Sequence, residues 1–389
     1  MPTPRRRQDE RASLRASLIG SLRRQGFRVR NNKILPPDNV TKGALRHLHR
    51  EAIGHRRQTA RRRLERREPE LLSCIASGQE VVPDQVAPKL IQVERGSTYE
   101  WLFRYVSLHW SIPVSSGYGR RLRFLVMDEA NGRLIGIIGL GDPVFSVAAR
   151  DNWVGWSFQA RRERLRNVME AFILGAVPPY SMLLCGKLVA MLVCSEEVRS
   201  AFARKYGQRA SLIQERTNDS RLAMVSTASA LGRSSVYNRI TYGGRTLYRT
   251  VGFTGGWGEF HFANGLYAKL FEFATRNCTP TAKHKGWGTG FRNRREVVRK
   301  CLAEIGLSDE LMNHGVAREL FVVPMAQNTN EFLRGEHVRL RWFHQTAAEL
   351  FAYFRERWLL PRSERDGRWE GFDRRDYSLW SNGISNADE

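Results

Sequence analysis

Two aspartates that follow a predicted β-hairpin are the first residues in this chain whose type and spacing would permit catalysis. Asp142 and Asp151 flank the segment DPVFSVAARD. Carboxylates at strand ends are ligands that Mg²⁺ prefers, and a bound Mg²⁺ supports phosphodiester cleavage. However, Asp142 precedes a proline, as turn-forming aspartates do, and Asp151 follows Arg150, with which it can form an ion pair. Because no third acid accompanies them, we predict no metal site, and a metal-dependent nuclease ranks last among our hypotheses.

A glutamate and a histidine near the middle of the chain form a second candidate pair. Glu259 and His261 belong to the aromatic segment EFHF, which we predict to be part of a strand. Alternating residues of a strand share one face, so this pair is a candidate for general acid–base catalysis. The alternative is that His261, like His109 in the segment LHW, is a histidine of an aromatic core. Both interpretations stay open.

A tyrosine is the third catalytic candidate. The run AFILGAVPPY predicts a strand, and the loop SMLLCGK leads into a helix that begins near Lys187, whose N-terminus would face an anionic ligand. The following LAMVSTASALGRSSVYNRI and VGF resemble the strand–helix–strand end of GNAT acetyltransferases. That resemblance implies that Tyr237 protonates the departing thiolate. Only Gly186 stands where that family's pyrophosphate loop has two spaced glycines, and the alternative is that Tyr237 is a core aromatic.

The remaining motif search limits the chemistry further. The chain has no phosphate-binding P-loop, dinucleotide fingerprint, HExxH or Gly-x-Ser-x-Gly segment. Its five cysteines have no Cys-x-x-Cys pair, so we predict buried thiols in a reducing compartment. The cofactor is left unassigned, and these observations do not decide whether the chain is an enzyme.

Positive charge is the dominant compositional feature. The 63 Lys and Arg exceed the 39 Asp and Glu by 24, so a polyanionic partner, most simply nucleic acid, is expected. Part of the excess lies in one run, HRRQTARRRLERR, which follows a helix predicted to start near Thr41. Its arginines are spread around the helix circumference, so the helix would stand in water or lie against phosphates. The plainer alternative is a solvated helix that keeps the protein soluble. The predicted nucleic-acid-binding residues of this run are Arg56, Arg57, Arg61, Arg62, Arg63, Arg66 and Arg67.

A second basic segment, KHKGWGTGFRNRREVVRK, interleaves cations with Trp287 and Phe291. Grooves that bind single strands combine phosphate-binding cations with stacking aromatics in this way. The alternative is an amphipathic helix, because Val298, Cys301, Leu302 and Ile305 recur at helical spacing. We weight the two interpretations equally. The nucleic-acid-binding candidates here are Lys283, Lys285, Arg292, Arg294 and Arg295.

The elements that would position these residues predict an α/β fold of the α+β kind, with a mixed sheet, flanking helices and a GNAT-like character. The strongest signal is a hairpin with strands at 121–128 and 133–140 around a type I′ turn at Asn131-Gly132. Further strands are expected within 171–180, 221–229, 246–262 and 318–326. Helices are expected at 10–25, from Thr41, at 184–205 and 264–275, and before Pro361.

The chain divides by composition into three predicted segments. Residues 1–90 form a basic helical region, 91–276 an α/β core domain, and 277–389 a basic extension with helices. The N-terminus lacks an apolar signal region, and the longest apolar stretch is interrupted by Gly186 and Lys187. We therefore expect a cytoplasmic protein with no membrane partner.

A larger resemblance covers about residues 100 to 335. It rests on FRYVSLHWSIPVSSGYGRRLRFLVMDEANGRLIGIIGLGDPVF, ARDNWVGW, GKLVAMLVCSEEV, STASALGRSSVYNRI, VGFTGGWGEFHF, REVVRKCLAEIG and RELFVVPMAQN. Together these segments resemble the protein A family of the Druantia anti-phage defence system. The resemblance implies a component of a multi-gene bacterial antiviral system whose largest partner resembles a helicase. It brings no established reaction.

Three functions remain as hypotheses. The first is a nucleic-acid-binding subunit of the defence system, with DNA as the expected ligand. The second is a GNAT-like transferase that modifies nucleic acid or protein, with Tyr237 as general acid. The third is the metal-dependent nuclease with Asp142 and Asp151.

Overall fold

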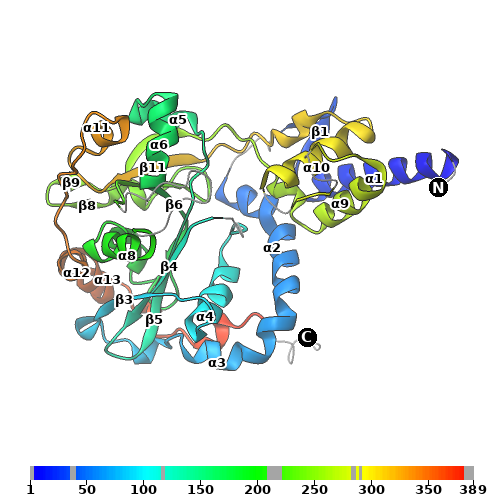
Figure 1. Cartoon of the computed structure of the whole chain (residues 1–389). Coiled ribbons are helices and arrows are strands. Elements are labelled where there is room, and N and C mark those ends of the chain that lie inside the picture. The colour runs from blue at the N-terminus through cyan, green and yellow to red at the C-terminus, as the bar shows by residue number, and fades with distance from the viewer. Residues whose placement is uncertain are drawn as a thin grey trace, which may run out of the picture.

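A seven-stranded mixed sheet forms the centre of the protein (Figure 1). The computed structural model describes residues 4–35, 41–114, 119–207, 221–281, 286–288 and 291–380. The strand order is β10-β11-β7-β6-β5-β4-β3, and all neighbours are antiparallel except β6 and β7. The predicted α/β class with a mixed sheet is confirmed. The strands are β3 (Pro88–Gln92), β4 (Arg121–Asp128), β5 (Arg133–Gly141), β6 (Val168–Ala176), β7 (Met224–Ala228), β10 (Arg249–Phe253) and β11 (Glu319–Pro324).

The predicted hairpin is β4 and β5, but its turn type was predicted wrongly. Residues 129–132 connect the strands, and of these only Gly132 has a positive φ, of 70°. A type I′ turn needs positive φ at both central residues. That condition is met instead at Asn31 (φ 48°) and Asn32 (φ 59°), which join the small strands β1 (Arg28–Arg30) and β2 (Lys33–Leu35).

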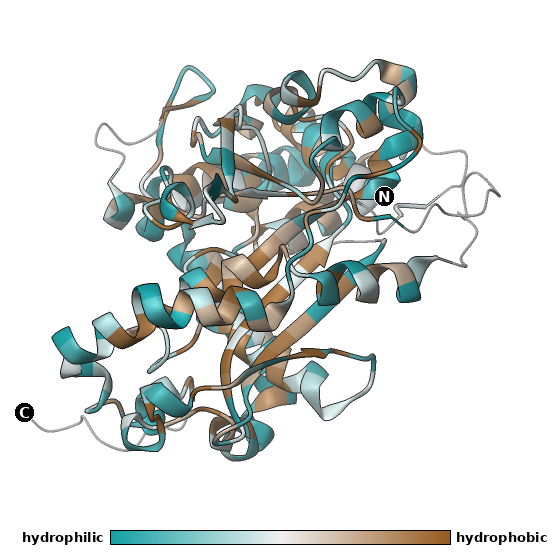
Figure 2. Ribbon diagram, turned by 90° about the vertical axis from the view of Figure 1, so that its left-hand side faces the viewer, coloured by the Kyte–Doolittle hydropathy of each residue, from teal (hydrophilic) through white to brown (hydrophobic). Residues whose placement is uncertain are grey.

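Both faces of the sheet are covered, which explains the nearly continuous apolar runs of β4 and β5. Leu122, Phe124 and Val126 of β4 join the core under α7 (Cys185–Leu192), α8 (Glu196–Tyr206) and α12 (Ala347–Phe354). Leu125 and Met127 join the opposite core with α3 (Glu68–Ser73) and α4 (Thr98–Val106). Figure 2 shows the strands as a hydrophobic band between helices with hydrophilic outer surfaces. A third apolar cluster lies under α5 (Ala148–Val154), α6 (Phe158–Arg164) and α11 (Thr329–Arg334).

Three predicted elements differ from the structure. The helix expected at 184–205 is two helices, because Ser195 caps α8 by accepting a hydrogen bond from the Val198 amide (3.4 Å). The strand expected to reach 262 ends at Phe253, and residues Phe260–Phe262 form the 3-10 helix η7. The last helix does not end before Pro361. The π-helical turn η9 (Arg355–Leu359) joins α12 to α13 (Leu360–Arg365), where proline occupies a first-turn position that needs no amide hydrogen.

A helical lobe lies beside the sheet, at the upper right of Figure 1. It combines α1 (Pro4–Arg24), part of α2 (Lys42–Leu64), α9 (Leu266–Asn277) and α10 (Phe291–Glu304). Leu18, Leu45, Leu270 and Leu302 are fully buried in its common core. The division into three sequence segments stays a prediction. The structure shows that the N-terminal helices share their core with helices on both sides of residue 276.

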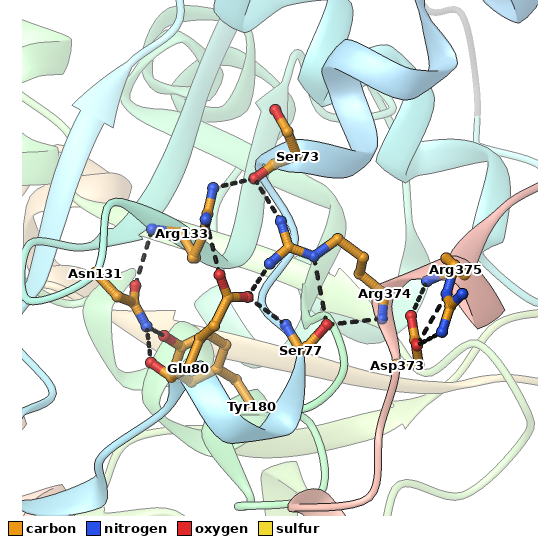
Figure 3. Close-up of polar contacts among 9 residues, drawn as sticks. All are labelled: Ser73, Ser77, Glu80, Asn131, Arg133, Tyr180, Asp373, Arg374 and Arg375. Atoms are coloured by element: carbon orange, nitrogen blue, oxygen red, sulfur yellow. Dashed lines mark hydrogen bonds and ion pairs between the residues drawn. The ribbon is translucent and has the colours of Figure 1, made fainter.

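The C-terminal strap, residues 366–380, returns to the start of α3. The Glu68 carboxylate, only 1% exposed, accepts hydrogen bonds from Tyr105 Oη (2.8 Å) and the Leu379 amide (2.6 Å). It also accepts from Ser378 Oγ (3.0 Å) and the Trp380 amide (3.2 Å). A neighbouring carboxylate, Glu80, contacts Arg133, Arg374 of the strap and the Ser77 amide (Figure 3). The strap is thus held by hydrogen bonds to residues early in the chain.

Candidate nucleic-acid interface

Helix α2, which carries the first arginine run, buries a different face at each end. Its N-terminal half packs Leu45, Leu48 and Ala52 into the helical lobe. Its C-terminal end packs Leu64 into the core beside α3 and α4. Leu48 and Leu64 are 16 residues apart, which at about 100° per residue places them roughly 160° apart around the helix. Helix α2 therefore connects the helical lobe to the sheet, as Figure 1 shows.

Four of the seven predicted phosphate-binding arginines contact the protein itself. Arg56 donates to Ser107 Oγ (2.9 Å) and Arg57 donates to the Leu108 carbonyl (3.1 Å). Burial lowers the pKa of Arg56 to about 10. Arg61 pairs with Glu65 (2.8 Å), and Arg67 lies over the Trp101 ring (5.0 Å). The expectation that the helix has no docked side is wrong, because Arg56 and Arg57 bind backbone and hydroxyl oxygens where an apolar residue would otherwise pack.

The other three arginines of the run are exposed and carry no ion pair with any residue that the structure describes. We call them the exposed arginine cluster: Arg62, Arg63 and Arg66. At about 100° per residue, all three lie within roughly 100° of one another around the helix. Arg46 and Arg50, which are also exposed and unpaired within the described part of the chain, lie on another side of α2. The cluster is the part of the predicted interface that a phosphate backbone could reach.

The described part of the second basic segment packs into the helical lobe. Val297, Val298, Cys301 and Leu302 are buried, which confirms the interpretation of α10 as an amphipathic helix. Arg294 pairs with Glu259 (3.2 Å) and lies over the Tyr267 ring (3.9 Å). Arg295 is half-buried. Lys283, Lys285 and the side chain of Arg292 lie outside the described residues, so their predicted role stays a prediction.

Glu259 and His261 do not share a strand face, because no strand forms there. Glu259 precedes η7 and pairs with Arg294, while burial raises the pKa of its carboxyl. His261 is fully buried, and its Nε2 bonds the Leu311 carbonyl (2.8 Å). Burial lowers the pKa of His261 to about 4. The structure thus favours the core interpretation of His261 over a role in proton transfer.

Tyr237 lies in the 3-10 turn η6 (Tyr237–Arg239), beside the parallel strands. Its ring stacks on Tyr248 with centroids 4.7 Å apart, and it meets Phe321 at 5.3 Å. Burial raises the pKa of the Tyr237 phenol to about 12, while its hydroxyl contacts the Thr227 side chain. The phenol is therefore protonated at neutral pH, as a general acid must be.

Asp142 and Asp151 are each committed to arginines. Asp142 pairs with Arg120 (2.6 Å), and Asp151 pairs with Arg150 (2.7 Å) and Arg161 (2.8 Å). Within the part of the chain that the structure describes, no group of three or more His, Cys, Asp or Glu side chains is arranged to hold a metal ion. The ion pair predicted between Asp151 and Arg150 is present, whereas Asp142, for which a turn role was predicted, pairs with Arg120.

A further group of cations was only partly anticipated from the sequence. Lys187 lies in the first turn of α7, as expected, but the Cys185 and Lys187 amides already donate to loop carbonyls (3.1 and 2.8 Å). Lys187 Nζ lies 4.5 Å from the centroid of Trp358, and Arg357 lies 5.3 Å from the same ring. Arg239, at the end of η6, is near enough to lower the pKa of Lys187. Nothing in the sequence signals that these three distant positions meet.

Comparison with known proteins assigns the chain to a family. A family model described as Druantia protein DruA matches residues 39–335. The chain belongs to this family. It is also 38% identical over 368 residues to Druantia protein DruA of Escherichia coli (strain UMEA 4076-1), covering 94% of this chain and 91% of that protein. The DruA match is consistent with a component of a Druantia anti-phage defence system and confirms the resemblance found in the sequence.

Two further observations concern solved structures and membrane-spanning helices. No solved structure matches the chain. Among the helices described here, none is both long enough and apolar enough to cross a bilayer. The residues matched by the DruA model include the exposed arginine cluster, Tyr237 and Lys187, but end before Arg357.

Proposed function

We propose that this DruA-family chain is the nucleic-acid-binding subunit of a Druantia defence system, with DNA as its ligand. The observation that carries the proposal is the exposed arginine cluster at the end of α2 and in the 3-10 turn η1 (Glu65–Arg67) that follows it, whose three guanidinium groups have no acidic partner in the described structure. The formal net charge of +24 supports it, because long-range attraction speeds encounters with polyanions.

The chemistry of the cluster suits backbone contacts rather than base recognition. Guanidinium groups bind phosphate oxygens through two parallel hydrogen bonds, and they stay charged at any physiological pH. Contacts of this kind position a protein on DNA without reading its sequence. Other subunits of the system, including the helicase-like protein that the family resemblance implies, would then act on DNA that this chain holds. Binding to the cluster is expected to weaken as salt rises.

Replacing Arg62, Arg63 and Arg66 by glutamine together is expected to weaken duplex binding about 10- to 100-fold at low salt. Three lost phosphate contacts should also make the slope of log K against log salt shallower by about 2.7. Fluorescence anisotropy on matched single- and double-stranded DNA, over a range of salt concentrations, measures both quantities. The matched control replaces Arg95, Arg162 and Arg204, which are equally exposed and unpaired within the described residues. Equal weakening in the two triple variants would overturn the proposal.

A GNAT-like transferase is the second candidate, and one observation favours it. The parallel strands β6 and β7 pair only from Val168↔Met224 to Glu170↔Ser226 and do not pair beyond that point, next to Thr227 and Tyr237. The segments that carry the resemblance itself are β7, the 3-10 turn η6 and β10, and β11 lies between β7 and β10 in the sheet. In the loop before α7, however, the Met182 carbonyl already accepts a hydrogen bond from Arg362 (3.1 Å).

Tyr237→Phe tests this second candidate. If the phenol donates the proton, its removal should lower the transfer rate by about 10²- to 10⁴-fold and abolish phage protection, while DNA binding stays unchanged. Plaque counts in cells that carry the complete defence system measure protection, and anisotropy measures binding. Tyr242→Phe, another half-buried tyrosine, is the control. Full protection by Tyr237→Phe would exclude that role for Tyr237.

A further inference from the structure

Two cations share one aromatic ring on the far side of the sheet from α2, a third is near enough to lower the pKa of the first, and none has a carboxylate partner among the described residues. They are Lys187 of α7, Arg239 of η6 and Arg357 of η9. Lys187 is half-buried, and the two arginines are exposed. The nearest acid in sequence, Glu356, pairs with Arg355 instead (3.0 Å). In Figure 1, α12 and α13, which flank η9, lie at the left and α2 lies at the right.

The backbone around Arg357 and Trp358 is unusual and well anchored. These residues belong to the π-helical turn η9, a geometry that is rare and concentrates at functional sites. The turn and the helix that follows it are tied to other segments, because Arg355 of η9 contacts Asp84 (3.3 Å) and Arg362 of α13 contacts Met182 (3.1 Å). The Trp358 ring packs near Phe354 (5.9 Å) and supports both Lys187 and Arg357.

The arrangement is electrostatically unfavourable without a ligand. Burial, followed by repulsion from Arg239 and Arg357, lowers the pKa of Lys187. Like charges held together destabilise a folded protein, whereas an anion placed between them converts the repulsion into attraction. A cation on the face of an aromatic ring also remains able to bind a second group at its open side. The ligand that satisfies all three groups is a compact anion with several charges.

We propose that Lys187, Arg239 and Arg357 form a binding site for the phosphates of a nucleotide, in particular a diphosphate or triphosphate group. Such a group supplies several charged oxygens within the span of three side chains, and both arginines present the planar donors that phosphates favour. The same chemistry occurs in a free nucleotide and at the phosphorylated end of a nucleic-acid strand. The site is separate from the exposed arginine cluster, so it does not depend on the proposed role of α2.

Calorimetric titration of the full chain with inorganic pyrophosphate at low salt tests the proposal. Lys187→Gln and Arg357→Gln should each weaken pyrophosphate binding at least tenfold. Arg204→Gln removes an exposed cation elsewhere and should change it less than twofold. Thermal unfolding of each variant shows whether it is folded. Absence of binding to the unmodified chain, or equal weakening by Arg204→Gln, would overturn the proposal.

Lysine reactivity gives a second measurement that does not rely on affinity. The lowered pKa of Lys187 leaves more of its amine unprotonated, so limited acetylation followed by peptide mass spectrometry should modify it readily. Pyrophosphate should protect Lys187 but not the exposed Lys42. Arg239→Gln should slow its modification, because removing a neighbouring positive charge raises the pKa. Unprotected Lys187 would contradict the site.

Competition distinguishes the two sources of phosphate. It uses the Arg62→Gln/Arg63→Gln/Arg66→Gln variant, in which DNA binding through α2 is weakened. Displacement of pyrophosphate by ATP identifies a free nucleotide as the ligand. Displacement only by a 12-nucleotide strand with a 5′-phosphate, and not by the same strand without it, identifies a strand end. Displacement by neither would exclude both ligands. Retention of pyrophosphate binding in this variant also separates the site from the function proposed for α2.

Discussion

Lowering the pH from 7 to 5 is expected to reduce the free energy of unfolding by roughly 6 kcal/mol through the helical lobe alone. Three histidines, His49, His261 and His314, lie buried together in the helical lobe. Burial lowers their pKa values from 6.5 to about 3, about 4 and about 3, respectively. Below pH 6.5, the unfolded chain therefore binds protons at these three histidines, whereas the folded chain keeps them neutral. The stability that the neutral histidines contribute is fully present above pH 6.5. It is lost as the pH falls, by about 2 kcal/mol per histidine at pH 5.

The contacts of these histidines explain why their rings stay neutral in the folded protein. Arg318 Nη2 lies 3.1 Å from His49 Nε2, and since a guanidinium only donates, that nitrogen must accept. The Val316 amide donates to His314 Nδ1 (3.1 Å), which occupies the lone pair of that ring. The His261 and His314 rings are 5.8 Å apart, so a charge on one opposes a charge on the other.

Urea unfolding at pH 7, 6 and 5 measures the loss. His314→Asn, which keeps an acceptor near the Val316 amide, should remove about 2 kcal/mol of the pH dependence. His47→Gln is the control, because His47 is exposed on α2 and should leave the slope unchanged. Equal stability at pH 7 and pH 5 would show that the three rings are not held neutral.

Glu68→Ala is expected to cost about 4 kcal/mol of stability. The substitution leaves four donors around a buried position without their acceptor: Tyr105 Oη, Ser378 Oγ and the amides of Leu379 and Trp380. Unpartnered buried polar groups cost about 1–3 kcal/mol each, partly relieved where water can enter. Because two of the donors belong to the backbone of the C-terminal strap, the strap should also detach more often.

Denaturant unfolding gives the stability change, and limited proteolysis shows how quickly the strap is cut. Glu70→Ala is the matched control in the same helix, since Glu70 is exposed and makes only a long ion pair with Arg67 (3.7 Å). It should change stability by less than about 0.5 kcal/mol. A Glu68→Ala protein as stable and as resistant as Glu70→Ala would show that the strap is held by contacts other than those of Glu68, such as the pair between Arg374 and Glu80.

The sequence predicted the strands of the sheet well where both faces of a strand are buried, because such strands are continuous apolar runs. The runs RLRFLVMD and RLIGIIGLG are apolar on both faces, so they identified β4 and β5 directly. Strand β3 was missed because it is an edge strand that begins at a proline, with half-buried residues in place of a strong alternation. The break between α7 and α8 depends on the single cap residue Ser195. It was missed because the apolar residues keep helical spacing across the break.

The candidate sites depended on long-range contacts that periodicity does not report. Arg56 and Arg57 were predicted to face solvent with their neighbours, yet residues 107 and 108 capture them. Lys187 was noted for its helix terminus, but its partners Arg239 and Arg357 lie far away in sequence. Glu259 and His261 failed as a strand pair because Gly255, Gly256 and Gly258 precede them, and the chain turns there into η7. In these cases the sequence identified residues that could bind or catalyse, but not the residues that contact them in the fold.

The two-faced docking of α2 fixes the rotational setting of its arginines. Because α2 is one rigid helix, it cannot rotate about its axis to change the packing of Leu48 without also moving Leu64 out of its core on the other side. Rotation of the helical lobe about the axis of α2 would therefore be transmitted as a twist to the sheet. A ligand bound to Arg62, Arg63 and Arg66 would therefore act at the C-terminal end of this rigid connection, next to the point where Leu64 packs beside α3 and α4.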